Sequence, residues 1–135
     1  MASERSMRSR VVHALKELDA MAVENMVQPG TPDIEYIGGW IELKSLDEWP
    51  KREDTVVALS HFVPAQRLWL QRRCKRGGKA WFVLRVGREW LVLDGGIASA
   101  IVGTATRAEL VTACTFYWSK TPTDQDLLAA FGGCR

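Results

Sequence analysis

The residues best suited to chemistry lie in the segment Pro32–Ser45. Two runs of alternating apolar and charged residues are separated there by Gly38-Gly39, a signal for a two-residue hairpin turn. Side chains along a strand point alternately to its two faces, so one face of this hairpin is expected to be apolar and the other charged. The apolar face carries Ile34, Tyr36, Ile41 and Leu43. The charged face carries Asp33, Glu35, Glu42 and Lys44.

The expected pairing across this hairpin brings like charges together. With both glycines in the turn, Glu35 lies opposite Glu42, and Asp33 lies opposite Lys44. Like charges in directly opposed positions destabilise a sheet. A divalent cation would convert the repulsion into ligation, because carboxylates are ligands that Mg²⁺ prefers. The alternative interpretation is the solvated face of an ordinary antiparallel hairpin.

The elements around the hairpin predict an α/β (α+β) domain. Apolar residues at helical spacing predict a first helix over residues 4–20, and Pro64 opens a second helix that ends at Gly77-Gly78. The order is helix, three strands, helix, two strands and helical C-terminal material, which favours a mixed sheet flanked by helices. Further strands are expected over 23–27, 80–86 and 90–94, and further helices from Thr106 and over 123–131.

Composition indicates one globular domain over residues 1–135. Of the 135 residues, 47% are hydrophobic and 25% are charged, near the averages for globular proteins. The longest uncharged stretch, 95–106, is too short to cross a bilayer. The N-terminus lacks the pattern of a signal peptide, and the three cysteines show no disulfide or zinc spacing. These features predict a cytoplasmic protein without a membrane partner.

Charge is distributed unevenly along the chain. Residues 17–54 hold ten acids and three bases, whereas residues 55–88 hold eight bases and no acid. A basic segment next to an acidic one favours a polyanionic partner such as nucleic acid, although separate solvated faces would give the same counts. The candidate nucleic-acid-binding residues of the basic segment are His61, Arg67, Arg72, Arg73, Lys75, Arg76 and Lys79.

These motifs resemble a known family. Pro32-Asp33 followed by Glu42-Leu43-Lys44 resembles the bipartite signature of the PD-(D/E)xK nuclease superfamily. The wider segment GTPDIEYIGGWIELK resembles the virus-type replication-repair branch and phage Holliday-junction-resolvase-like nucleases. Gln66, in the second helix, matches a glutamine of that branch. The resemblance covers about residues 3–94 and implies a restriction-endonuclease-like core.

The resemblance implies a Mg²⁺- or Mn²⁺-dependent DNA endonuclease, selective for branched DNA and acting in phage replication, recombination or repair. Asp33, Glu42 and the backbone carbonyl of Leu43 would hold the metal. Lys44 would orient water and stabilise charge on the phosphate, and Gln66 would support the site. An acid from the first helix is also expected: Glu4, with Glu17 and Glu24 as alternatives. A non-catalytic DNA-binding or interaction module retaining the fold is the alternative function.

The C-terminal segment, about residues 97–135, lies beyond the resemblance. It is rich in small and apolar residues and has two expected roles, covering the sheet or forming a homodimer interface suited to a twofold junction. Its large apolar residues are Ile97, Ile101, Val102, Phe116, Tyr117, Trp118 and Phe131.

Overall fold

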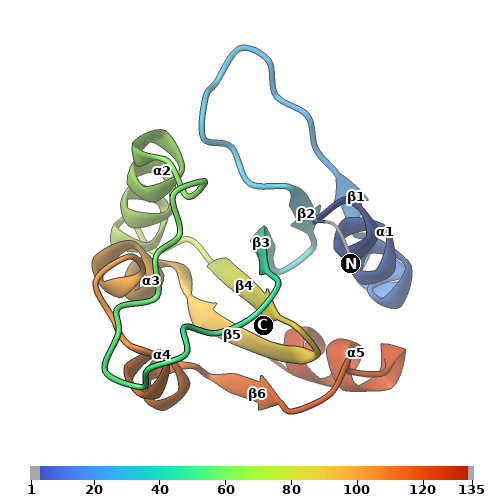
Figure 1. Cartoon of the computed structure of the whole chain (residues 1–135). Helices are drawn as coiled ribbons and strands as arrows, with labels where there is room; N and C mark the ends of the chain where they lie inside the picture. The colour runs from blue at the N-terminus through green and yellow to red at the C-terminus, as the bar shows by residue number, and fades with distance from the viewer. Residues whose placement is uncertain (1–3, 134–135) are drawn as a thin grey trace.

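The computed structural model describes residues 4–133, and these form a mixed α/β fold around a six-stranded sheet (Figure 1). The strands lie in sequence order, β1 to β6, and only β3 and β4 are parallel. Helix α2 makes the crossover between those two strands. The strands are β1 (Met21–Ala22), β2 (Ile34–Tyr36), β3 (Gly39–Leu46), β4 (Ala80–Val86), β5 (Glu89–Asp94) and β6 (Phe116–Trp118). The helices are α1 (Glu4–Ala14), α2 (Pro64–Lys75), α3 (Gly95–Ile101), α4 (Arg107–Ala113) and α5 (Asp124–Gly132), with a 3-10 turn, η1, at Lys16–Leu18.

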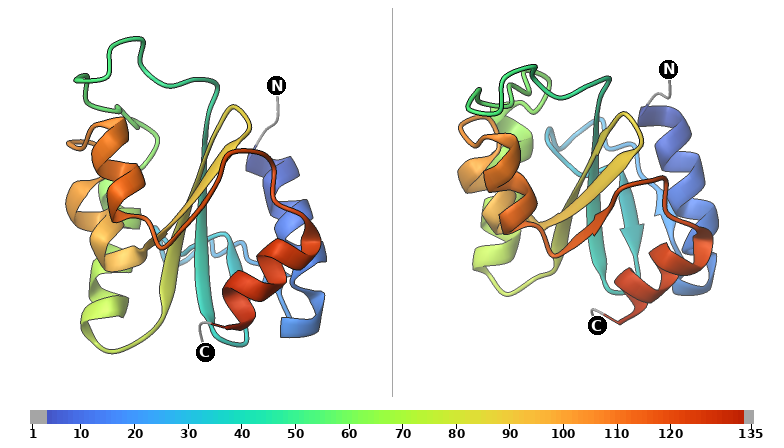
Figure 2. Two further views of the ribbon diagram at one scale, coloured as in Figure 1. Left: turned by 90° about the horizontal axis from the view of Figure 1, so that it is seen from below. Right: turned by 60° about the horizontal axis from the view of Figure 1, so that its bottom comes forward.

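The helices cover both faces of the sheet (Figure 2). Helices α1 and α5 lie side by side on one face, and α2, α3 and α4 lie on the other. Strand β3 supplies both cores, because its side chains alternate: Ile41 and Leu43 pack towards α1 and α5, and Trp40 packs towards α2. The alternation predicted for the hairpin is therefore confirmed, and Glu42 and Lys44 lie on the α2 face.

The hairpin register differs from the predicted one by two residues. Ile34 pairs with Ile41, Glu35 with Trp40 and Tyr36 with Gly39, so the predicted Glu35–Glu42 and Asp33–Lys44 pairs are wrong. A shift of two keeps every side chain on its predicted face. The turn consists of Ile37 and Gly38, and a Cβ on Gly39 would stand 2.4 Å from the carbonyl oxygen of Lys79. This glycine is thus needed for close approach to the chain entering β4, and it is a strand residue rather than a turn residue.

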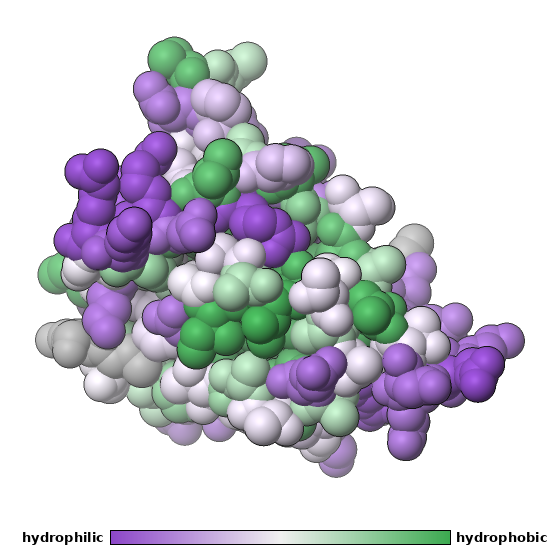
Figure 3. Space-filling model, turned by 90° about the vertical axis from the view of Figure 1, so that its left-hand side faces the viewer, coloured by the Kyte–Doolittle hydropathy of each residue, from purple (hydrophilic) through white to green (hydrophobic). Residues whose placement is uncertain are grey.

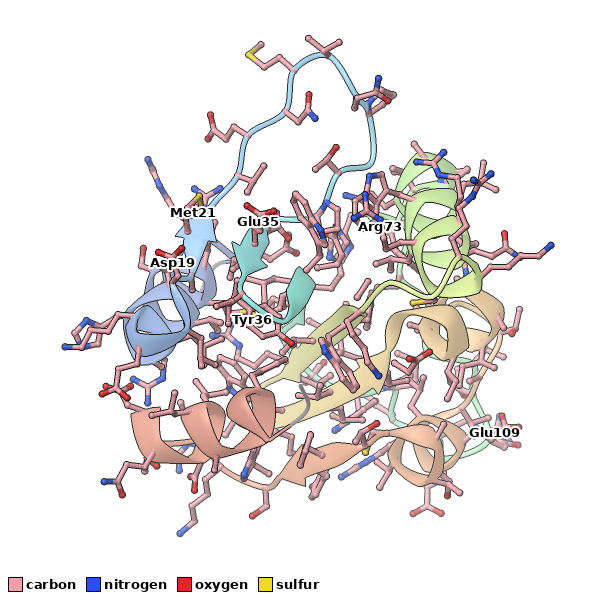
Figure 4. The ribbon with its side chains drawn as sticks, turned by 180° about the vertical axis from the view of Figure 1, so that it is seen from behind. Asp19, Met21, Glu35, Tyr36, Arg73 and Glu109 are labelled. Carbon is pink, nitrogen blue, oxygen red and sulfur yellow. The ribbon has the colours of Figure 1, made fainter. Side chains whose placement is uncertain are left out.

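The N-terminal elements are shorter than predicted. Helix α1 ends at Ala14, and η1 is followed by Asp19 in the left-handed region at φ 58°. The predicted strand over 23–27 is wrong: β1 is the two-residue segment Met21–Ala22 (Figure 4), and residues 23–33 form a loop. Asn25 turns the chain in this loop, because its side-chain oxygen accepts bonds from the backbone N–H groups of Val27 and Gln28.

The helix and strand limits predicted beyond the hairpin are confirmed within one or two residues. Helix α2 begins at Pro64, β4 spans 80–86, and Thr106 and Thr123 cap α4 and α5 with their side chains. Helix α3 and strand β6 were not predicted, so the C-terminal segment is not purely helical. Phe131 is 1% exposed in the core beneath α1 and α5. This segment therefore covers the sheet.

No helix within residues 4–133 combines the length and the apolarity that crossing a membrane requires.

Candidate active site

Asp33 and Glu42 come together where β2 meets β3. One step beyond the Ile34–Ile41 pair, the register brings Asp33 next to Glu42. Asp33 is fixed there, because its Oδ2 accepts a 2.8 Å hydrogen bond from the backbone N–H of Leu43. Figure 4 shows Glu35 and Tyr36 on opposite sides of β2, as the alternation requires. The structure thus joins the two predicted acids and the Leu43 backbone, and it leaves Glu35 across from Trp40.

Glu42 and Lys44 are buried, which excludes the solvated-face interpretation for these two residues. Their side chains are 1% and 5% exposed, and Lys44 Nζ lies 3.3 Å from Glu42 Oε2. The pKa of Glu42 is raised to about 9: burial is the largest cause, the Asp33 carboxylate also raises it, and Lys44 lowers it. Lys44 is too weak a compensation, since burial and a neighbouring carboxylate both oppose the charged form. Burial and the Asp33 carboxylate therefore favour the protonated form of the Glu42 carboxyl group.

The donor set fits a divalent cation. Neither oxygen of the Glu42 carboxyl group has a well-formed hydrogen bond within the described residues, although both are buried. The ion pair with Lys44 is the contact that compensates this burial in part, and a hard cation is a further partner that carboxyl oxygens would accept. Asp33, Glu42 and the carbonyl of Leu43 offer oxygen atoms only. In the part of the chain from 4 to 133, however, no three His, Cys, Asp or Glu side chains are close enough to hold a metal by themselves.

Glu4 reaches the same end of β3 from helix α1. Its Oε2 accepts a 3.2 Å bond from the backbone N–H of Ser45 and lies 2.9 Å from His61 Nε2. A cavity of about 310 Å³ is lined by Glu4, Asp33, Glu24, Arg5 and Arg8. Glu4 and Glu24 therefore both adjoin Asp33. Glu17 lines a different cavity, between α1 and α5, which argues against it as the added acid.

Gln66 lies in the first turn of α2, where it caps its own helix. Its Oε1 accepts a 3.0 Å bond from the backbone N–H of Val63, so this oxygen is occupied by the helix start. The turn is nevertheless tied to the loop that leads to Asp33. A Cβ on Gly30 would stand 2.2 Å from the carbonyl oxygen of Ala65, and Gly30 has φ +85°. Only glycine fits this contact, which holds the start of α2 against the segment before Asp33.

The basic residues divide into internal and external groups. Arg67 is internal: its guanidinium donates to the carbonyls of Ser99 (2.7 Å) and Val102 (2.8 Å) and lies over Phe62. Arg73 lies over Trp69 and Trp40, at 4.5 and 5.6 Å from the ring centroids. Exposed basic residues at the end of α2 contribute to the hydrophilic surface in Figure 3. They are Arg72, Lys75 and Arg76, and Lys79 follows them, also accessible to solvent.

We expect the exposed basic residues at the end of α2 to contribute to the affinity for a polyanion. We do not expect this of Arg67, whose guanidinium is bonded inside the fold. Replacing Arg72, Lys75 and Arg76 together by Ala should reduce the slope of log K against log salt by about 0.9 for each duplex phosphate that is no longer neutralised. Binding titrations at several salt concentrations measure this slope. Arg67→Ala serves as the control and should lower the melting temperature without changing the slope. Equal slopes for the wild type and the triple variant would show that these residues only face solvent.

Arg85 is a buried polar residue that the sequence motifs did not indicate. It is 7% exposed, its guanidinium donates a 2.9 Å bond to Ser45 Oγ, and burial lowers its pKa. Arg85, Ser45, Glu4 and His61 thus form a connected polar chain from β4 to the loop before α2. The available signal was a single charged residue within the otherwise apolar strand Ala80–Val86.

The chain matches no protein-family model, and no curated protein is significantly similar to it.

Proposed function

We propose that this protein is a divalent-metal-dependent DNA endonuclease that hydrolyses phosphodiester bonds. One observation carries the proposal: two carboxyl groups, Asp33 and Glu42, adjoin on the sheet, the Glu42 carboxyl group is buried, and the Lys44 ammonium lies 3.3 Å from it. The resemblance of the same residues to the PD-(D/E)xK nucleases supports it. That resemblance also carries the proposed preference for branched DNA.

The chain's own residues have separable roles in this proposal. A divalent cation held by Asp33, Glu42 and the Leu43 carbonyl would supply positive charge that polarises a phosphodiester and favours ionisation of water. Asp33 is preoriented by the Leu43 N–H, so its carboxylate needs little reorganisation. Lys44 is held in a dry site, where its charge acts strongly on a phosphate that becomes more negative. The exposed basic side chains of α2 begin at Arg72, about 10 Å along the helix from Gln66 at roughly 1.5 Å per residue. They would contact the phosphates that flank the scissile one.

A nicking assay on supercoiled plasmid tests the proposal directly. Conversion to the open-circular form should require Mg²⁺ or Mn²⁺ and should stop in excess EDTA. Absence of nicking with either metal, across a range of pH, would contradict the enzyme proposal. Retained salt-dependent DNA binding in that case would support the second candidate.

Lys44→Ala is expected to separate charge stabilisation from metal binding. The change removes a cation and no ligand, so cleavage should fall by about 10²-fold or more, as when one preorganised charge-stabilising group is removed. Metal affinity should stay equal or rise, because the positive neighbour of Glu42 is gone. Calorimetry with Mn²⁺ and the nicking assay measure the two effects. Abolished metal binding with unchanged cleavage would contradict the role proposed for Lys44.

The second candidate is a non-catalytic DNA-binding module with this fold. Two observations favour it: the described residues contain no group of three metal-binding side chains, and Gln66 Oε1 is occupied by the cap of α2. Cleavage by the wild type, dependent on Asp33, would exclude it.

A further inference from the structure

The loop between β1 and β2 carries two adjacent apolar residues that are almost fully exposed. Met26 is 96% exposed and Val27 is 82% exposed, the two highest values among the exposed large hydrophobic residues described. The loop forms the top of the molecule in Figure 1, and its tip is coloured hydrophobic at the top of Figure 3. Single exposed apolar residues are common, but an adjacent pair on a projecting tip is not explained by packing.

The tip is held in shape by local bonds. Asn25 Oδ1 accepts from the N–H groups of Val27 (3.0 Å) and Gln28 (2.9 Å), and Thr31 Oγ1 donates to the Gln28 carbonyl at 2.9 Å. Gly30 is wedged against the Ala65 carbonyl. A preorganised tip loses little conformational entropy when it binds a partner, so its exposed side chains can contribute more of their contact energy.

The loop also begins and ends at the candidate active site. Glu24, before the tip, and Asp33, after it, line the same cavity as Glu4, Arg5 and Arg8. Val27 is six residues from Asp33, which limits the distance between their Cα atoms to about 20 Å. A nucleic acid bound at Asp33 would therefore pass within reach of the tip.

The tip of the loop is uncharged, and arginines lie near its base. Residues 25–32 contain no acidic or basic side chain, so the tip itself does not repel phosphates. The arginines of the cavity stand at its root, and Arg8 lies 4.0 Å from Glu24. Apolar side chains inserted between base steps unstack them and bend the duplex, which is cheapest where stacking is already interrupted.

We propose that Met26 and Val27 insert against nucleobases at a branch point or other unstacked step, and that this contact gives the protein its preference for distorted DNA. The inference rests on the proposed nuclease function. It identifies the substrate as DNA with accessible base faces next to the scissile phosphate.

Fluorescence of 2-aminopurine placed at a four-way junction centre tests the contact, because this base brightens when it is unstacked. Wild-type protein is mixed with the labelled junction and with a matched linear duplex in Ca²⁺. The test variant is Met26→Ser with Val27→Ser. The control is Ile37→Ser, which removes an apolar side chain 73% exposed at the other end of the hairpin. Cleavage of the linear duplex in Mg²⁺ is measured in parallel.

The wild type and the Ile37→Ser control should both brighten the junction label. The tip variant should not, and its junction affinity should fall about tenfold, which corresponds to roughly 1.4 kcal/mol. Its cleavage of the linear duplex should stay unchanged. A tip variant that brightens and binds the junction like the wild type would overturn the inference alone.

Two further outcomes distinguish the proposals. If the wild type neither binds nor cuts DNA, the proposed function fails and the inference fails with it. If light scattering shows a wild-type dimer that becomes a monomer in the tip variant, with no brightening by either protein, the tip contacts a second copy of the chain, and the inference is wrong.

Discussion

Asp33→Asn should reduce metal-dependent cleavage of DNA by about 10²–10³-fold or more, the usual cost of removing one preorganised charged group from a catalytic site. The substitution removes a negative charge but keeps an oxygen that can accept the N–H of Leu43. The fold and the position of the side chain should therefore persist. The nicking assay in Mg²⁺ and Mn²⁺, with circular dichroism as a check on folding, measures the effect.

Glu35→Gln is the matched control for this change. Glu35 lies on β2, two residues after Asp33 and on the same face of the sheet, but it pairs with Trp40 and not with Glu42. Its substitution should leave cleavage nearly unchanged. Wild-type activity of Asp33→Asn would contradict the role proposed for Asp33. Equal impairment of Glu35→Gln and Asp33→Asn would show that the effect is not specific to Asp33.

Glu42→Gln is expected to stabilise the metal-free protein at alkaline pH. Burial raises the pKa of Glu42 from 4.5 to about 9. Between these values the folded protein holds a proton that the unfolded chain has released, so stability falls as pH rises through this window. Gln resembles the protonated form and removes that dependence. The free energy of unfolding at pH 8 should rise on the order of 2–4 kcal/mol, with little difference at pH 5.

Chemical denaturation at pH 5 and pH 8 measures this difference. The metal provides an internal control, because a cation favours the ionised carboxylate and should stabilise the wild type at pH 8 but not Glu42→Gln. If the difference in free energy of unfolding between Glu42→Gln and the wild type is the same at pH 5 and pH 8, Glu42 is charged in the folded protein and the prediction is wrong.

Much of the fold was predictable because local signals agreed with the final structure. Pro64 and Gly77-Gly78 mark α2, and Thr106 and Thr123 mark the starts of two later helices. The elements that were not predicted have weaker or conflicting signals, since Asp94 caps α3 but two glycines follow it. Strand β6 has three residues and forms only because it pairs with β5, and helix α3 begins at two glycines, which disfavour helices in isolation.

The sequence predicted which residues form the candidate site, but it did not predict how they are paired and buried. Asp33, Glu42 and Lys44 follow from the alternation of the hairpin, which a register shift of two does not alter. The burial of Glu42 and Lys44 depends on tertiary packing, which the alternation of the hairpin does not specify. The contact of Glu4 with His61 was not predictable either, because it joins two elements that are far apart in the sequence. The same holds for the bond from Arg67 to the carbonyl of Ser99.

The packing of α5 on α1 affects when the site can form during synthesis. Every predicted metal-binding atom lies before residue 44, yet α1, which carries Glu4 to Ser45, shares its core with Leu127 and Phe131. Arg10 is also bonded to the Pro122 carbonyl, at 2.6 Å. A chain still emerging from the ribosome lacks these partners until α5 is made. We therefore expect the packing of the N-terminal helix, and with it the assembly of the polar end of β3, to follow the synthesis of α5.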